Sequence, residues 1–244
     1  MKHLIVLPAF NEEDALPDTL AKLQRLPDNF ELLIVNDGSS DRTGAVADRL
    51  ARTSRLACRV VHLPMNCGIG GSMQTGYLFA ARRGCYGYVI QFDADGQHDA
   101  SYVQTLVREC EEKNLDLAVG SRFLLVDDSN FRSSFARRLG IAFFLWLIRA
   151  LSGSRVSDPT SGFRCAGPRA WQCFARQYPE DYPEPESLFW CVRNRLRIGY
   201  VPVRMHERRG GVSSIRRFKA VYYMLKVSLS IFVESMRGRE RVAP

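Results

Sequence analysis

The sequence predicts an α/β domain with a mostly parallel central sheet, helices on both faces of that sheet, and a C-terminal amphipathic helix. Short apolar runs alternate with amphipathic stretches through the first half of the chain. Polar or Gly-rich clusters follow these apolar runs, and in parallel sheets such clusters meet at the carboxyl ends of the strands. The hydrophobic share of 46% and the charged share of 25% are those of a globular protein with a sizeable core.

Five short runs have the apolar, β-branched composition of buried strands: residues 4–7, 32–35, 59–63, 88–90 and 117–120. Helices are expected after the first three of them: residues 15–26, a helix that begins at Thr43, and a helix that the Gly-rich loop 66–71 opens and that runs to about Arg83. The first two helices carry apolar residues at helical spacing. This order predicts that the polar segments after strands one, two, four and five converge on one crevice.

The second half of the chain departs from this alternation. Residues 134–151 predict one long helix that is apolar nearly all round, which is typical of a helix that is buried or lies on a membrane face. Residues 201–203 predict a late strand, and residues 216–237 predict an amphipathic helix with a narrow polar stripe. That last helix could contact a membrane, a partner subunit or its own domain. No run of about 18 uncharged apolar residues occurs, so we expect no membrane-spanning helix.

The chain is basic, with 34 Lys and Arg against 26 Asp and Glu and a formal net charge of +8. Such an excess favours an anionic partner, which could be nucleic acid, a phosphorylated substrate or an acidic membrane surface. No nucleic-acid-binding module accompanies the charge, so we expect no nucleic-acid partner. The seven cysteines lack metal-binding spacing and the first residues do not form a signal peptide. We therefore expect reduced thiols and a cytoplasmic protein, peripheral on the inner face of the cell membrane.

Two carboxylates, Asp93 and Asp95, stand one residue apart where the predicted fourth strand ends. Residues i and i+2 of an extended chain point to the same side, so both carboxylates can face one ligand. Hard carboxylate oxygens at this place suit a Mg²⁺ or Mn²⁺ ion that a substrate diphosphate also holds. The alternative is a plain Asp-Gly turn with two solvated carboxylates. The convergence of the other polar segments favours the metal site.

Residues 8–12 occupy the place after the first strand where a dinucleotide-binding fold has its G-x-G-x-x-G fingerprint. The Gly-rich stretch 68–71 follows the third strand instead, and the G-K-[ST] sequence of a phosphate-binding P-loop does not occur. These observations argue against a redox function and against a P-loop enzyme.

Five motifs stand in order along the chain: residues 8–12 (Pro-Ala-Phe-Asn-Glu), 35–41 (Val-Asn-Asp-Gly-Ser-Ser-Asp), 66–70 (Asn-Cys-Gly-Ile-Gly), 93–98 (Asp-Ala-Asp-Gly-Gln-His) and 120–123 (Gly-Ser-Arg-Phe). With these motifs the sequence resembles glycosyltransferase family 2, in the branch of dolichol- and polyprenyl-phosphate sugar synthases. The resemblance covers most of residues 1–215 and implies the single-domain nucleotide-diphospho-sugar transferase fold of the GT-A type. Residues 216–244 are left as an amphipathic helix and basic tail that face a membrane or a partner.

The resemblance implies a role for each matching residue. The nucleotide sugar would be bound by Pro8, Phe10, Glu12, Val35, Asp37, Ala94, Arg122 and Arg208. The catalytic residues would be Asp93, Asp95, Asp158 and Arg122, of which Asp93 and Asp95 would hold the metal. The acceptor would meet Arg164, Glu184, Glu186, Ser213 and Ser214. Two positions depart from the family, because Phe10 stands where a Tyr is usual and Ser214 stands where the polyprenyl-phosphate enzymes offer a Lys.

Three of these assignments have an alternative in the sequence, and for the contacts in residues 207–215 it is a flexible, Gly-rich surface loop with scattered charge. Glu12 could be a first-turn charge of the following helix, and residues 183–186 (Pro-Glu-Pro-Glu) could be the polar first turn of a helix around residues 188–196. Asp37 lies too early to cap the helix that begins at Thr43. Its carboxylate can instead accept a hydrogen bond from an N–H group of a nucleotide base.

The resemblance implies a metal-dependent, inverting hexosyltransferase of cell-envelope or polysaccharide biosynthesis, with Mg²⁺ or Mn²⁺ as cofactor. It would move a sugar from a nucleotide-diphosphate sugar to a polyprenyl-phosphate or glycan acceptor. A lipid phosphate is already an anion, whereas a sugar hydroxyl would need a general base, for which Asp158 is the candidate. A second copy of the chain or a small membrane protein could be a partner.

Two other functions are open to the sequence. Nucleotidyl transfer to a sugar phosphate also uses aspartates and a metal, but it normally has a Gly-rich, Arg-containing loop after the first strand, which is missing here. An inactive membrane-associated scaffold of the same fold is the other, and the retained Asp93, Asp95 and Arg122 argue against it.

Overall fold

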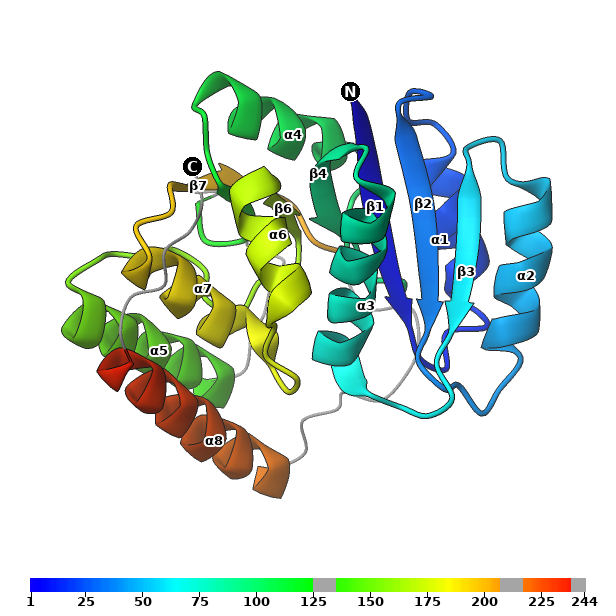
Figure 1. The fold of residues 1–244 in the computed structure, drawn as a ribbon. Coiled ribbons are helices and arrows are strands. Elements are labelled where there is room, and N and C mark those ends of the chain that lie inside the picture. The colour runs from blue at the N-terminus through cyan, green and yellow to red at the C-terminus, as the bar shows by residue number, and fades with distance from the viewer. Residues whose placement is uncertain (125–134, 207–216, 238–244) are drawn as a thin grey trace.

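The computed structural model describes residues 1–124, 135–206 and 217–237, and a mixed sheet forms the centre of this part of the chain (Figure 1). Its seven strands are β1 (Lys2–Ala9), β2 (Phe30–Asn36), β3 (Cys58–His62), β4 (Tyr86–Gln91), β5 (Leu117–Ser121), β6 (Arg164–Ala166) and β7 (Ile198–Pro202). They lie in the order β3-β2-β1-β4-β6-β5-β7. All neighbouring pairs are parallel except the two that β6 makes with β4 and β5. The predicted α/β fold with a mostly parallel sheet is confirmed.

Helices cover both faces of the sheet, as predicted. They are α1 (Leu16–Leu23), α2 (Thr43–Thr53), α3 (Gly68–Arg83), α4 (Tyr102–Glu112), α5 (Phe135–Ser152), α6 (Pro168–Arg176), α7 (Pro183–Arg193) and α8 (Arg217–Met236). Side chains alternate along a strand, so Ile5 and Leu7 of β1 pack with α1, α2 and α4 on one face. Leu4 and Val6 pack with α3, α6 and α7 on the other face. The helices α4 and α6 were not among the predicted elements.

Strand β6 is an unpredicted element that shapes the functional edge of the sheet. It is three residues long, too short to show a period in the sequence. It runs antiparallel between β4 and β5, with Arg164 opposite Gln91 of β4 and Val119 of β5. The segment before it, residues 157–163, therefore lies at the carboxyl ends of β4 and β5.

Helix α7 begins at Pro183, earlier than the start predicted near residue 188. Proline suits the first position of a helix, where its missing N–H group leaves no hydrogen bond unmade. Glu184 and Glu186 lie in the first turn, where the positive end of the helix dipole stabilises carboxylates. The alternative that residues 183–186 form the first turn of a helix is confirmed.

A third apolar cluster joins α5, α7 and α8 at one end of the molecule (Figure 1). Its buried members are Phe144, Ile148, Phe189, Val227 and Ile231. Helix α8 thus packs through one face on the domain that precedes it. The predicted boundary between this domain and the C-terminal segment, at residue 215, lies outside the described residues and stays a prediction. None of the described helices has both the length and the apolar character that crossing a bilayer requires.

We expect Ile231→Ala to lower the free energy of unfolding by about 2–5 kcal/mol, because it leaves a cavity between α8 and its neighbours. Leu225→Ala is the matched control on the same helix. Leu225 is 68% exposed, so its truncation should change the free energy of unfolding by less than about 0.5 kcal/mol. Urea titration followed by circular dichroism measures both variants. Equal changes would show that α8 does not pack on the domain in solution.

Candidate active site

The carboxyl ends of β1, β2, β4 and β5 lie along one edge of the sheet, as their parallel pairing and order require. The polar segments after these strands converge there, as the sequence predicts. The segment 157–163 that leads into β6 also reaches this edge, since a Cβ atom at Gly162 would lie against Asp93 and Asp158 binds Arg122. The site is therefore built from loops of the parallel part of the sheet and from the antiparallel insertion.

The turns after β1 and β2, residues 10–13 and 37–43, are linked by side chain–backbone hydrogen bonds, and we call them the joined turns. The Ser40 N–H donates to Asn11 Oδ1 at 2.9 Å, and the Asn11 N–H donates to Ser39 Oγ at 3.0 Å. The Glu12 N–H donates to Thr43 Oγ1 at 2.8 Å. Asn11 has a φ of 55°, a left-handed conformation that asparagine tolerates. The two predicted nucleotide-binding motifs thus form one unit.

Glu12 is buried within these turns, with 7% of its surface exposed. Helix α1 begins at Leu16, whose N–H donates to the Glu12 carbonyl. Glu12 therefore precedes the helix, and the alternative of a first-turn helix charge is wrong. Among the other predicted nucleotide contacts, Phe10 is 45% exposed, Pro8 is partly buried and Val35 is buried. Phe10 is thus accessible to a planar ligand, and the binding roles stay predictions.

Asp37 is buried at the end of β2 and lies against the Gly-rich loop before α3. The Cys67 N–H donates to Asp37 Oδ1 at 2.7 Å. Burial raises the pKa of Asp37, and hydrogen bonds from the loop backbone oppose that rise. Gly38 has a φ of 62°, and a Cβ atom there would lie 2.5 Å from the Met65 backbone, so only glycine fits. The motifs 35–41 and 66–70 are in direct contact.

The two predicted metal ligands follow β4 on either side of Ala94, which is buried. The Ala94 carbonyl accepts a hydrogen bond from Thr19 Oγ1 at 3.0 Å. The Asp93 side chain is 30% exposed and Asp95 is 8% exposed. Asp95 Oδ1 accepts the Gln97 N–H at 3.0 Å, which holds the turn after it. Hydrogen bonds from α1 and from the turn itself therefore support the carboxylate pair.

Two buried residues without a predicted role contact Asp93. The Asp93 N–H donates to His98 Nδ1 at 3.0 Å, and His98 Nε2 lies 3.5 Å from Asp93 Oδ2. Gln91 Nε2 donates to Asp93 Oδ1 at 3.4 Å. His98 belongs to the 93–98 motif, and Gln91 is a polar residue inside an apolar strand. Both residues stand out in the sequence, but only the structure shows that they contact Asp93.

The arrangement around Asp93 fits the predicted metal. A Cβ atom at Gly162 would lie 3.2 Å from Asp93 Oδ2, so this glycine leaves a cradle beside the carboxylate. Within the described ranges, His, Cys, Asp and Glu side chains form no group of three or more that could hold an ion alone. Two carboxylates suit Mg²⁺ or Mn²⁺, because these ions usually take their other ligands from water and substrate phosphates. Asp93 and Asp95 are the residues that would hold the ion.

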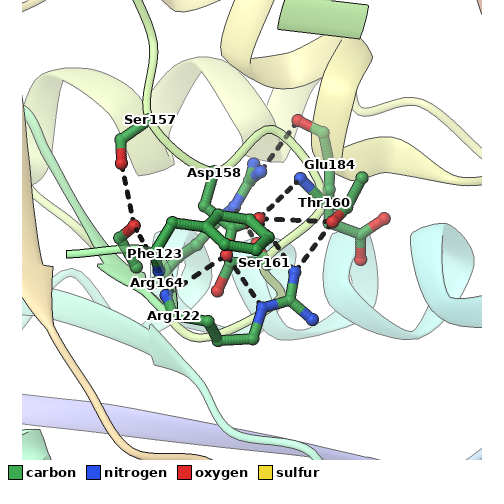
Figure 2. A network of polar contacts seen from close by, with 9 residues as sticks. Arg122, Phe123, Ser157, Asp158, Thr160, Ser161, Arg164 and Glu184 are labelled. Carbon is green, nitrogen blue, oxygen red and sulfur yellow. Dashed lines mark hydrogen bonds and ion pairs between the residues drawn. The ribbon is translucent and has the colours of Figure 1, made fainter. Parts of the chain in front are cut away.

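Arg122 and Asp158 form a buried ion pair across the site (Figure 2). The Nε–Oδ2 and Nη2–Oδ1 distances are both 2.8 Å, and Nη2 also donates to Thr160 Oγ1 at 2.8 Å. Asp158 has no exposed side-chain surface and Arg122 has 6%. A bidentate pair of this kind is a strong, charge-assisted contact. The structure brings both predicted residues together, while the phosphate contact of Arg122 and the base role of Asp158 stay predictions.

Arg164 is 2% exposed and belongs to the same network of polar contacts (Figure 2). Its Nε donates to the Ser161 carbonyl at 2.7 Å, its Nη1 to Ser187 Oγ at 2.8 Å and its Nη2 to the Glu184 carbonyl at 2.8 Å. Arg164 therefore ties β6 to the loop before it and to the first turn of α7. This buried position gives Arg164 a structural role, and the acceptor contact predicted for it stays a prediction.

The two glutamates of α7 have different surroundings. Glu184 lies within electrostatic range of Asp93, and burial raises the pKa of Glu184 while Arg164 lowers it. Glu186 is hydrogen-bonded by Ser230 of α8, and burial raises the pKa of Glu186 to about 7. Glu184, and not Glu186, therefore lies within electrostatic range of Asp93, which follows β4. The remaining predicted contacts lie outside the described residues: Arg208, Ser213 and Ser214.

Comparison with known proteins points to one family. The sequence profile described as "Glycosyl transferase family 2" matches residues 4–172. The chain is 33% identical over 245 residues to undecaprenyl-phosphate mannosyltransferase of Micrococcus luteus, which covers 98% of this chain and 99% of that protein. It is 29% identical over 239 residues to polyprenol monophosphomannose synthase of Mycolicibacterium smegmatis, which covers 93% of this chain and 86% of that protein.

Solved structures share the fold. Glucosyl-3-phosphoglycerate synthase from Mycobacterium tuberculosis, in complex with Mn²⁺, UDP and glucosyl-3-phosphoglycerate, has a TM-score of 0.69 at 21% identity and covers 96% of this chain and 79% of that one. TarS from S. aureus, in complex with UDP-GlcNAc, has a TM-score of 0.63 at 15% identity and covers 98% of this chain and 68% of that one. The predicted GT-A type fold is confirmed.

We expect Asp158→Asn to lower the free energy of unfolding by about 3–5 kcal/mol, because it leaves the buried Arg122 guanidinium without its charged partner. The double variant Arg122→Met, Asp158→Leu removes both charges and should recover much of this loss. Glu13→Gln is the control, since it weakens the ion pair with the exposed Arg42 and should cost less than about 1 kcal/mol. Chemical denaturation measures all three. A loss in Asp158→Asn no larger than in Glu13→Gln would contradict the buried pair.

Proposed function

Because the chain belongs to glycosyl transferase family 2, we propose that this glycosyltransferase moves a sugar from a nucleotide-diphosphate donor to a polyprenyl phosphate. Two relatives that align with 93% and 98% of this chain are named for polyprenol and undecaprenyl-phosphate mannose transfer, which supports that acceptor. A place in cell-envelope or polysaccharide biosynthesis is part of the same proposal. Membership of this family supports neither of the two alternatives from the sequence, which are nucleotidyl transfer and an inactive scaffold.

The observation that carries the proposal is the carboxylate pair Asp93 and Asp95 at the end of β4, on the same sheet edge as the joined turns. The joined turns supply Phe10 and Asp37 to the nucleoside, and the carboxylates lie where the diphosphate would follow. A Mg²⁺ or Mn²⁺ ion held by Asp93 and Asp95 would offset the charge of the departing nucleoside diphosphate. The Mn²⁺ and UDP in the glucosyl-3-phosphoglycerate synthase structure support such an ion here.

The ion pair at Asp158 favours a phosphate acceptor over a sugar hydroxyl. A hydroxyl must lose its proton to a base as it attacks, whereas a lipid phosphate is already an anion at neutral pH. Both carboxylate oxygens of Asp158 accept hydrogen bonds from Arg122, so each is already engaged by the guanidinium and not directed at an acceptor hydroxyl. An acceptor that needs no base fits this site better.

We also propose that the exposed apolar faces of α5 and α8 rest on the membrane that carries the lipid acceptor. The exposed apolar residues are Leu139, Trp146 and Leu151 on α5 and Tyr222, Leu225, Leu229, Phe232, Val233 and Met236 on α8. Exposed apolar residues at helical spacing are typical of a surface that contacts lipid. The exposed Arg149 and Arg237 add basic charge that anionic headgroups attract. A small membrane protein is the other occupant that the sequence leaves open.

We expect the purified protein with Mn²⁺ to transfer a sugar to undecaprenyl phosphate from one member of a panel of GDP- and UDP-sugars. Asp95→Asn should reduce the rate about a hundredfold or more, because it weakens the hold on the metal at the leaving group. Asp99→Asn is the control, since its carboxylate lies in the same loop but accepts the Ser101 N–H at the start of α4. Chromatography of the labelled lipid product measures each rate.

Three outcomes of this assay would contradict parts of the proposal. Transfer to a glycan hydroxyl but not to undecaprenyl phosphate would contradict the lipid acceptor. Activity that survives EDTA and Asp95→Asn would contradict the metal. Release of diphosphate from a nucleoside triphosphate and a sugar phosphate would indicate nucleotidyl transfer instead.

We expect the triple variant Leu225→Gln, Leu229→Gln, Phe232→Gln to sediment with anionic liposomes about tenfold less than the wild type, because these exposed side chains would enter the lipid. Leu78→Gln on α3 is the control, since it replaces another exposed leucine, and it should sediment as the wild type does. High salt should weaken binding of every variant, because it screens the basic residues. Equal sedimentation of triple variant and wild type would contradict the membrane contact.

A further inference from the structure

We propose that His98 is a positioning residue that sets the orientation of the Asp93 carboxylate and thereby the geometry of the metal and diphosphate site. The inference rests on the proposed function, because it takes Asp93 as a carboxylate that meets the metal. His98 contacts Asp93 twice. Its Nδ1 accepts the Asp93 backbone N–H at 3.0 Å, and its Nε2 lies 3.5 Å from Asp93 Oδ2.

The first of these contacts determines where the imidazole carries its proton. Nδ1 accepts an N–H group and so has no proton, which leaves the proton of the neutral ring on Nε2. Nε2 is the atom that faces the Asp93 carboxylate, so the ring offers a donor to the side chain and an acceptor to the backbone of one residue. Burial, helped by Arg122 and opposed by Asp95, lowers the pKa of His98 to about 4, which agrees with a neutral ring.

The ring itself is held by packing. It stacks on Phe163 with 4.7 Å between ring centroids and 14° between planes, and it meets Phe92 edge-on at 5.3 Å and 85°. The His98 backbone forms a β-bridge with Met205. With 3% of its surface exposed, the ring has no room to turn. The carboxylate must therefore adopt the orientation that the ring imposes.

A second donor acts on the other oxygen of the same carboxylate. Gln91 Nε2 donates to Asp93 Oδ1 at 3.4 Å, and Gln91 has no exposed surface. Gln91 at one oxygen and the His98 ring 3.5 Å from the other restrict rotation of the carboxylate while leaving it lone pairs for a cation. Groups that orient a metal ligand in this way typically change metal affinity by about ten- to a hundredfold.

Two variants separate the two contacts of His98, and a third serves as the control. His98→Asn keeps an acceptor near the Nδ1 position but offers no donor at the Nε2 position, whereas His98→Gln places an amide N–H near Nε2. We expect His98→Asn to weaken Mn²⁺ binding about tenfold or more and His98→Gln to weaken it less than about threefold. His206→Asn is the control, because His206 is 57% exposed, and it should bind Mn²⁺ as the wild type does.

Titration of the full chain with Mn²⁺ alone, followed by the electron paramagnetic resonance signal of the free ion, measures these affinities. Circular dichroism confirms that each variant is folded. Equal weakening of Mn²⁺ binding in His98→Gln and His98→Asn would overturn the inference. If His98 had only a structural role, replacing it by either residue would lower the affinity by the same factor. Wild-type affinity in His98→Asn would also overturn it. Asp93→Asn reports on the proposed function separately: if it binds Mn²⁺ as tightly as the wild type, the metal role of Asp93 fails and the inference falls with it.

Discussion

The buried ion pair of Arg122 with Asp158 is the contact on which the proposed acceptor side of the site depends. Arg122 follows β5 and Asp158 precedes β6, so the pair ties the antiparallel insertion to the parallel part of the sheet. Two buried charges are tolerated only when they are paired and hydrogen-bonded, and Thr160 supplies a further hydrogen bond. The same pairing holds the segment 157–162 at the end of β4, where Gly162 approaches Asp93. The position of the insertion therefore follows from an electrostatic requirement.

The two halves of the site, which we propose are a donor side and an acceptor side, have different physical support. On the donor side, the joined turns are held by side chains that satisfy backbone N–H groups near the surface, as Asn11 does for Ser40. On the acceptor side, the support is a buried cation: Arg164 donates to both the loop before β6 and the first turn of α7. Loss of a buried donor leaves its acceptors unsatisfied, which is costlier than a similar loss at the surface. The acceptor side should therefore tolerate less change in sequence.

Helix α7 connects the site to the surface that we propose meets the membrane (Figure 1). Its first turn carries Glu184, within electrostatic range of Asp93. Further along, Phe189 packs in the same cluster as Ile231 of α8 and Phe144 of α5. A lipid acceptor would have its phosphate at the carboxylates of β4 and its chain in the bilayer. One packed helix that contacts both regions would keep their separation constant.

Local patterns of apolar residues and turn glycines were enough to predict every described strand except β6, every described helix except α4 and α6, and the order of the motifs. The sequence also predicts that Asp37 and Asp93 lie at the same edge of the sheet, because the carboxyl ends of parallel strands meet there. Three features could be read only from the folded chain: Asp158 pairs with Arg122, Arg164 is buried, and β6 runs antiparallel between β4 and β5. The paired side chains are separated by 36 residues, and a partner at that distance leaves no periodic trace in the chain. Their pairing was decided by which charges the folded sheet buries together, because a charge buried without a partner is strongly unfavourable.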